Sequence, residues 1–244
     1  MNLLQATIKQ ARRFVLRLIY WRRRNARYVI ILGGPGAGKG TMANRLAPAL
    51  GLPKLSMGDA FRREHAAGTE VGLKAWPYVS TGKLVPDELT TPVLVTELDQ
   101  PKYINGTIID GLPRTFPQAV FLDGHLDGWG LEVERVIMLD VPEADLIERL
   151  SHRRTCSNKL CGRTYHLVMQ PPAEAGKCDA CGHALYQRED DNPEAIRERL
   201  AIFAVESKPI RDYYKAKGLL TNVQSTNAKG IDAVFAEVLS AVKG

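Results

Sequence analysis

Several features are scarce or absent in this chain of 244 residues, and each absence excludes a class of protein. Only four cysteines occur, far fewer than a small disulfide-stabilised scaffold contains. No run of 18 apolar residues is present, so no segment predicts a membrane-spanning helix. Hydrophobic residues make up 45% of the chain, which excludes global disorder. The composition is that of a folded globular protein.

Acidic residues are also absent from the first 27 positions, whereas eight basic residues occur there. The whole chain has 33 basic and 27 acidic residues, a formal net charge of +6. Outside the first 27 positions the balance is 25 basic to 27 acidic residues, so the excess belongs to an N-terminal extension. A charge confined to one segment does not indicate a nucleic-acid-binding surface on the body of the protein.

The extension, residues 1–27, has the periodicity of an amphipathic helix, with apolar residues on one arc and basic residues on the other. Such a helix suits a membrane surface or an organelle-import signal. Import signals are usually rich in serine, and this segment contains none. A basic helix that is merely solvated explains the pattern equally well.

Beyond the extension, the chain predicts an α/β protein in which strands alternate with helices. Strands are expected at 28–32, 107–110, 135–140 and 219–223, and helices at 39–50, 194–217 and 230–243. This alternation is typical of a parallel sheet covered by helices on both faces.

A glycine-rich segment, Gly-Gly-Pro-Gly-Ala-Gly-Lys-Gly-Thr at 33–41, follows the first predicted strand. Its glycines allow successive backbone N–H groups to converge on phosphate oxygens, and the next helix adds the positive end of its dipole. Lys39 would supply a full charge to the β- and γ-phosphates. The usual pattern has Ser or Thr directly after the lysine, whereas here Gly40 precedes Thr41. The residues expected to bind phosphate are Gly36, Ala37, Gly38, Lys39, Gly40 and Thr41.

A second motif, Asp-Gly-Leu-Pro-Arg-Thr-Phe-Pro-Gln-Ala at 110–119, begins where another predicted strand ends. Asp110 has the usual position of a residue that holds Mg²⁺ through water beside a phosphate loop. Further motifs are Leu-Ser-Met-Gly-Asp-Ala-Phe-Arg (55–62), Gly-Lys-Leu-Val-Pro-Asp-Glu-Leu (82–89) and Arg-Glu-Asp-Asp (188–191). In this order the motifs resemble the adenylate kinase family, and the resemblance extends from residue 28 to the C-terminus.

The resemblance implies a P-loop fold of three layers, with a parallel sheet between helices and with two inserts. The core would comprise residues 28–56, 87–152 and 190–244. A small helical insert at 57–86 would bind the nucleoside monophosphate, and a zinc-bearing insert at 153–189 would form a lid. The polar segment 190–193 would be a hinge and the start of a helix, because it has cap residues followed by proline.

The family's reaction is the Mg²⁺-dependent transfer of a phosphoryl group from ATP to AMP, giving two ADP. By resemblance, the catalytic residues would be Lys39, Arg114, Arg153, Arg188 and Arg199. Besides the 36–41 loop, the ATP-binding residues would be Arg149, Arg153, Thr164, Tyr165 and Lys229. The AMP-binding residues would be Met57, Arg62, Lys83, Leu84, Val85, Gly111, Arg114, Gln118, Arg188 and Arg199. The family usually has Thr at the position of Met57 and an aromatic residue at that of Leu112.

All four cysteines lie in one short stretch, as Cys156-x4-Cys161 and Cys178-x2-Cys181. This spacing suits a tetrahedral structural Zn²⁺ site, which would stabilise a lid too small to fold on its own core. His166 or His183 could replace one cysteine as a ligand. Disulfides or four free thiols are the alternatives.

Two other functions fit parts of the sequence. One is a related kinase that uses GTP as donor, or UMP or CMP as acceptor. The other is a non-catalytic, zinc-stabilised nucleotide-binding module held at a membrane by the N-terminal helix, although such a module would not need the arginines. The resemblance also implies a cytoplasmic monomer, or a mitochondrial protein if the extension is an import signal in a eukaryote.

Overall fold

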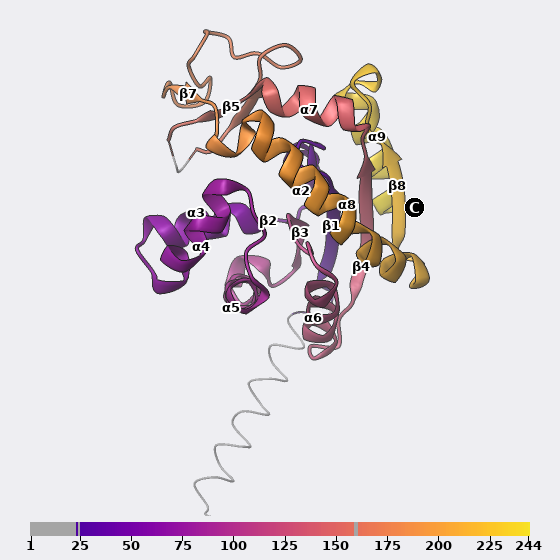
Figure 1. The fold of residues 1–244 in the computed structure, drawn as a ribbon. Coiled ribbons are helices and arrows are strands. Elements are labelled where there is room, and N and C mark those ends of the chain that lie inside the picture. Colours follow the sequence, from indigo (N-terminus) through magenta and orange to yellow (C-terminus); the bar gives the residue numbers. More distant parts are fainter. Residues whose placement is uncertain (1–22, 24, 159–160) are drawn as a thin grey trace, which may run out of the picture.

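The structure is a computed structural model that describes residues 23, 25–158 and 161–244 (Figure 1). The amphipathic helix predicted for the extension therefore lies outside the described residues, apart from its last few positions. Within the described ranges, no helix has the length and apolar character needed to cross a membrane.

Five parallel strands form the central sheet, in the order β2-β3-β1-β4-β8. Their bounds are β1 (Arg27–Gly33), β2 (Lys54–Ser56), β3 (Gly106–Asp110), β4 (Val133–Asp140) and β8 (Leu220–Gln224). The four predicted strands are confirmed with small differences at their ends, and the three-residue β2 was not predicted. The middle of β1 is buried on both faces, as expected for a central parallel strand.

Helices cover both faces of this sheet, which confirms the predicted α/β architecture (Figure 1). They are α2 (Lys39–Leu50), α5 (Asp87–Leu98), α6 (Phe116–Asp127), α7 (Glu143–Ser151), α8 (Pro193–Ala216) and α9 (Ile231–Lys243). Alternate β1 residues enter two separate cores, because side chains alternate across a strand. Ile30 packs with α5 and α6, whereas Ile31 packs with α2 and α9. Helix α8 contributes to both cores, with Leu200 in one and Tyr214 in the other.

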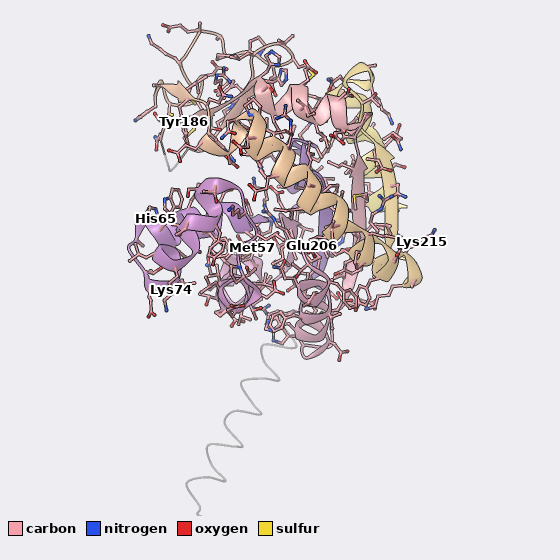
Figure 2. The ribbon with its side chains drawn as sticks, in the orientation of Figure 1. Met57, His65, Lys74, Tyr186, Glu206 and Lys215 are labelled. Atoms are coloured by element: carbon pink, nitrogen blue, oxygen red, sulfur yellow. The ribbon has the colours of Figure 1, made fainter. Side chains whose placement is uncertain are left out.

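Two helices, α3 (Met57–Ala66) and α4 (Glu70–Thr81), form an arm beside the sheet (Figure 1). Each begins at a capping side chain: Ser56 accepts from Asp59 N, and Thr69 accepts from Gly72 N. His65 of α3 stacks on Trp76 of α4 with ring centroids 4.0 Å apart, which holds the two helices together. Figure 2 shows His65 on this arm and Met57 where the arm joins the sheet. The arm lies within residues 57–86.

A second, antiparallel sheet has the order β6-β5-β7 and lies within residues 153–189. Its strands are β5 (Arg153–Cys156), β6 (Thr164–His166) and β7 (Leu185–Tyr186). Its buried hydrophobic cluster consists of Cys156, Tyr165 and Cys178, with three partly buried residues packed against them. Such a small core contributes little hydrophobic stabilisation.

The last basic residues of the extension contact the core. Arg27 is the first residue of β1 and makes a two-pronged contact with Glu134, through Nε at 2.8 Å and Nη2 at 2.7 Å. Arg23 is buried, donates to the carbonyl of Leu98 at 2.9 Å and lies 3.8 Å from the ring centroid of Trp129. These two charges are therefore part of the folded body.

Candidate active site

The phosphate loop connects β1 to α2 at the carboxyl edge of the central sheet. Gly36 and Gly38 have φ values of 81° and 90°, which favour glycine. A Cβ at residue 36 would also come 2.9 Å from Leu150 Cγ, so no larger residue fits there without movement. Helix α2 begins at Lys39, as predicted, directly after the loop. Its free N–H groups and its dipole favour an anion at this edge.

Lys39 points back across the loop that precedes it. Its Nζ donates to the carbonyl oxygens of Gly33 and Gly34, each at 2.8 Å. Burial, together with the positive charges of nearby arginines, lowers the pKa of Lys39 to about 7 against the opposing charge of Asp110. The amine is thus held where a bound phosphate would stabilise its charged form.

Asp110 ends β3 beside the same loop. A Cβ at residue 40 would come 3.3 Å from Asp110 Oδ2, so the carboxylate lies against the first turn of α2. This closeness gives a physical reason for Gly40 in place of Ser or Thr. A carboxylate at this edge fits the water ligands of a Mg²⁺ ion bound with a nucleotide.

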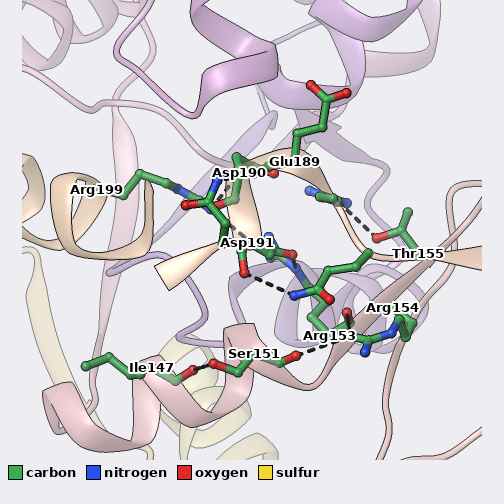
Figure 3. Close-up of polar contacts among 12 residues, drawn as sticks. Ile147, Ser151, Arg153, Arg154, Thr155, Glu189, Asp190, Asp191 and Arg199 are labelled. Atoms are coloured by element: carbon green, nitrogen blue, oxygen red, sulfur yellow. Dashed lines mark hydrogen bonds and ion pairs between the residues drawn. The ribbon is translucent and has the colours of Figure 1, made fainter. Parts of the chain in front are cut away.

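Asp190 and Asp191 join the small sheet to the start of α8 (Figure 3). Asp191 is buried and accepts from Arg153 at 2.8 and 2.6 Å. Arg199 of α8 contacts Asp191 Oδ1 at 3.2 Å and Asp190 Oδ2 at 2.9 Å. Asn192 then caps α8 by accepting from Ala195 N at 2.9 Å, and Pro193 is its first residue, as predicted. These contacts fix two predicted catalytic arginines from different elements in one cluster.

Two further arginines, Arg188 and Arg114, extend this group of positive charges. Arg188 Nε donates to Thr155 Oγ1 at 2.9 Å, and burial together with the charges of Arg153 and Arg62 lowers the pKa of Arg188 to about 10. Arg114 Nε donates to the carbonyl of Gly111 at 3.1 Å. Lys39, Arg114, Arg153, Arg188 and Arg199 are called the cation group below.

A largely apolar pocket opens beside the cation group, between the loop, the end of β3 and α8. Its walls include Leu84, Gly111, Arg114, Arg199 and Phe203. Gly82, at the end of α4, has a φ of 75°, and a Cβ there would come 2.6 Å from Arg199 Cδ. The α3–α4 arm therefore meets α8 at close range in this pocket.

The other residues predicted to bind AMP have varied surroundings. Met57 is buried in the core, and Arg62 pairs with Asp59 on the same helix. Lys83 is exposed and lies 3.8 Å from Glu198, while the Val85 carbonyl accepts from Thr90 Oγ1 at 3.2 Å.

Gln118 is buried, and both ends of its side-chain amide make hydrogen bonds. Its Oε1 accepts from Arg114 N at 2.7 Å, and its Nε2 donates to Asp87 Oδ1 at 2.7 Å.

On the other side of the phosphate loop, Arg149 connects α7 to the segment after β8. It donates to Asn227 Oδ1 at 2.7 Å, to Ser225 O at 2.7 Å and to Ala37 O at 3.5 Å. Lys229 lies on the same segment, but its amine contacts Glu237 at 2.7 Å and Gln224 O at 3.0 Å. Asn227 rather than Lys229 therefore makes the contact with Arg149.

The four cysteines converge in the small sheet as free thiols. The Sγ atoms of Cys156 and Cys181 are 3.4 Å apart, those of Cys161 and Cys178 are 3.7 Å apart, and all four lie within 4.8 Å of one another. A disulfide bond would need about 2.05 Å. Tetrahedral Zn²⁺ with bonds of about 2.3 Å separates its sulfur ligands by about 3.8 Å, so the arrangement fits that ion.

The two predicted lid residues of β6 differ in exposure. Tyr165 is buried against the cysteines, and its hydroxyl accepts from Asp179 N at 2.8 Å. Thr164 is exposed.

Comparisons with known proteins agree with this geometry. A family model described as Adenylate kinase matches residues 31–219. The chain belongs to the adenylate kinase family. It is 45% identical over 210 residues to an adenylate kinase of Archaeoglobus fulgidus, covering 86% of this chain and 95% of that protein. It is 42% identical over 215 residues to an adenylate kinase of Carboxydothermus hydrogenoformans, covering 88% of this chain and 99% of that protein. The adenylate kinase resemblance and the P-loop α/β fold are thus confirmed.

Sequence reasoning missed several residues of this adenylate kinase site. Asp190 and Asp191 were recognised only as a hinge, although they hold two arginines. Asn227 and Asp87 were missed because their partners are far away in the sequence. Asn227 contacts Arg149, 78 residues away, and Asp87 contacts Gln118, 31 residues away. The acidic first turn of α5, which begins at Asp87, was the one sequence feature that could have drawn attention to this residue.

Proposed function

We propose that this chain catalyses the reversible, Mg²⁺-dependent transfer of the terminal phosphoryl group of ATP to AMP, giving two molecules of ADP. The observation that carries the proposal is the cation group, in which burial and neighbouring arginines lower the pKa values of Lys39 and Arg188. Cations held this close together are stabilised by anions, and two nucleotides supply several phosphates. Family membership supports the same reaction.

The chemistry requires no general base, because the acceptor phosphate of AMP is already ionised. Catalysis consists of aligning two polyanions and neutralising the charge that keeps them apart. Lys39 and the loop amides hold the β- and γ-phosphates, while Arg188 and Arg199 hold the phosphates on both sides of the transferred group. The planar guanidinium suits this role because it donates two parallel hydrogen bonds to phosphate. Mg²⁺ bound with ATP would neutralise further charge, and Asp110 would hold that ion through water.

The two nucleotides occupy opposite sides of the phosphate loop in this proposal. ATP contacts the loop (36–41), Arg149, Arg153, Thr164, Tyr165 and Lys229. AMP contacts Met57, Arg62, Lys83, Leu84, Val85, Gly111, Arg114, Gln118, Arg188 and Arg199. The α3–α4 arm and the small sheet act as separate inserts, 57–86 and 153–189, that close over the substrates. Closure excludes water, which would otherwise hydrolyse ATP; the adenylate kinase lid is itself a standard example of such gating.

We propose further that Cys156, Cys161, Cys178 and Cys181 bind a structural Zn²⁺. The distances between their sulfur atoms suit this ion, and the buried cluster around them is too small to stabilise the sheet alone. The resemblance also supports a monomer in the cytoplasm. Size-exclusion chromatography with light scattering tests the oligomeric state.

A kinetic panel tests the proposed substrates. Purified protein is assayed with MgATP and AMP, CMP, UMP or GMP, and with AMP and either MgATP or MgGTP, and the products are separated by chromatography. We expect the highest kcat/KM for the ATP and AMP pair. A higher kcat/KM for CMP, UMP or GMP, or for GTP, would contradict the assignment.

A further inference from the structure

We infer that Asp87 is a specificity-determining positioning residue, which selects the base of the acceptor by fixing the orientation of the Gln118 amide. The inference rests on the proposed function, in which Gln118 contacts the base of AMP. Asp87 is the first residue of α5 and is not one of the proposed nucleotide contacts. Asp87 would act on the base only through the Gln118 side chain, whose amide it holds.

The hydrogen bonds around Gln118 have only one possible direction. Asp87 is a carboxylate and accepts, so the –NH2 end of the Gln118 side chain must face it, at 2.7 Å. The backbone N–H of Arg114 can only donate, so the carbonyl end must face Arg114, at 2.7 Å. A flipped amide would put oxygen against carboxylate and N–H against N–H. The network therefore permits a single orientation of this amide.

Thr115 holds the carboxylate in place. Its hydroxyl donates to Asp87 at 3.1 Å to Oδ2 and 3.2 Å to Oδ1, and it accepts from Gln118 N at 3.3 Å as the cap of α6. The same three residues thus join the starts of α5 and α6. Because Gln118 is buried, its side chain has little room to leave this network.

An amide held in this way presents a fixed pattern to a base. The Gln118 amide has two N–H donors and two carbonyl lone pairs, and the contacts above use one of each. The second N–H and the second lone pair match an adenine edge, which has an amino donor beside a ring-nitrogen acceptor. Purines with a carbonyl at position 6, such as hypoxanthine and guanine, have an acceptor in place of that amino group. At the Watson–Crick edge their ring nitrogen N1 also carries a proton, so they would require the flipped amide, which Asp87 and the Arg114 N–H oppose.

The test compares AMP with IMP as acceptors, because hypoxanthine changes this edge without adding the 2-amino group of guanine. In Asp87→Asn, the side chain can donate as well as accept, so only the Arg114 N–H still opposes a turn of the Gln118 amide. We expect the ratio of kcat/KM for AMP to that for IMP to fall about tenfold or more, since a two-bond base contact is worth about that factor. The KM for MgATP should stay within about twofold of the wild-type value, because Asp87 contacts no proposed ATP residue.

Glu88→Gln is the matched control. It removes an equal charge from the same first turn of α5, and Glu88 is exposed. Its AMP-to-IMP ratio should equal that of the wild type. An unchanged ratio in folded Asp87→Asn, or an equal fall in Glu88→Gln, would overturn the inference. Wild-type protein that fails to phosphorylate AMP would overturn the proposed function as well, so the two failures are distinguishable.

A second measurement does not depend on a folded Asp87 variant. In nucleotide-free wild-type protein, one side-chain N–H of Gln118 should exchange slowly with solvent, as the hydrogen bond to Asp87 requires. NMR identifies its signals by their loss in Gln118→Ala. Fast exchange of both side-chain protons would overturn the inference.

Discussion

Lys39 shows at the scale of one residue how the site is prepared for an anion. Its amine contacts two backbone carbonyls, and Arg114, Arg153 and Arg199 act on it as neighbouring positive charges. Burial and these charges outweigh Asp110, so the pKa of Lys39 is lowered to about 7. A bound phosphate would supply the missing negative charge, so nucleotide binding and the charge of Lys39 stabilise each other.

Replacing Lys39 with Met should separate catalysis from folding. We expect kcat to fall by about 10²–10³-fold, the usual effect of removing one stabilising group from a transition state. The Tm of the nucleotide-free variant should equal or exceed that of the wild type, because the substitution removes one of several cations that repel one another. Steady-state kinetics and thermal unfolding measure the two effects. Lys74→Met, at an exposed lysine paired with Glu70, is the control and should change neither. Full activity in Lys39→Met would mean that the site is misassigned.

Nucleotide binding should also take up a proton. The pKa of Lys39 is about 7 in the empty site, and a bound phosphate should raise it toward its ordinary value of 10.5. Between these pH values the complex holds more protons than the free protein, so ATP affinity should decrease as pH rises, by up to about tenfold per unit. Calorimetry at pH 8.5 in buffers of different ionisation enthalpy should detect uptake approaching one proton in the wild type and none in Lys39→Met. Absence of uptake in the wild type would refute the expectation.

At the scale of elements, Asp190 and Asp191 form the junction between the small sheet and α8. Asp191 is buried there and contacts Arg153 of β5 and Arg199 of α8. A rearrangement of this junction would move both arginines together. The fold thus couples the position of the small sheet to the arrangement of the cation group.

Asp191→Asn should weaken this junction, because two arginines lose their buried carboxylate partner. We expect the free energy of unfolding to fall by about 3 kcal/mol, the cost of breaking a buried ion pair. Urea denaturation measures the change. Asp212→Asn, at an exposed aspartate of α8 that pairs with Lys208, should stay within about 0.5 kcal/mol of the wild type. Equal effects of the two substitutions would contradict this account.

Loss of the proposed Zn²⁺ should affect the small sheet first. Cys178→Ser should abolish stoichiometric zinc binding, lower the Tm and raise the KM for MgATP, because the small sheet has little core of its own. Elemental analysis and thermal unfolding provide the measurements. Ser157→Ala, beside a predicted ligand and exposed, should retain one zinc per chain. Wild-type protein without zinc, in which all four thiols titrate freely, would eliminate the proposed site.

At the scale of the whole molecule, the sequence sufficed for the layers and for the phosphate loop. Buried parallel strands are continuous apolar runs, and the loop is local, so both are visible in neighbouring residues. The three-residue β2 was too short to give a pattern. Contacts such as Arg149 with Asn227 arise only when α7 meets the segment after β8, and no local pattern encodes them. Arg23 and Arg27 also show this limit, since their charge suggested an extension whereas their contacts belong to the core.

The most direct test of the central claim starts from ADP alone. Because the proposed reaction is reversible, purified protein with Mg²⁺ and ADP should form ATP and AMP in equal amounts, and Lys39→Met should form them far more slowly. Quantitative chromatography of the three nucleotides over time gives the answer. ATP and AMP appearing together in a one-to-one ratio is the predicted result. No conversion of ADP, or AMP and free phosphate without ATP, would contradict the assignment of this site to phosphoryl transfer between two nucleotides.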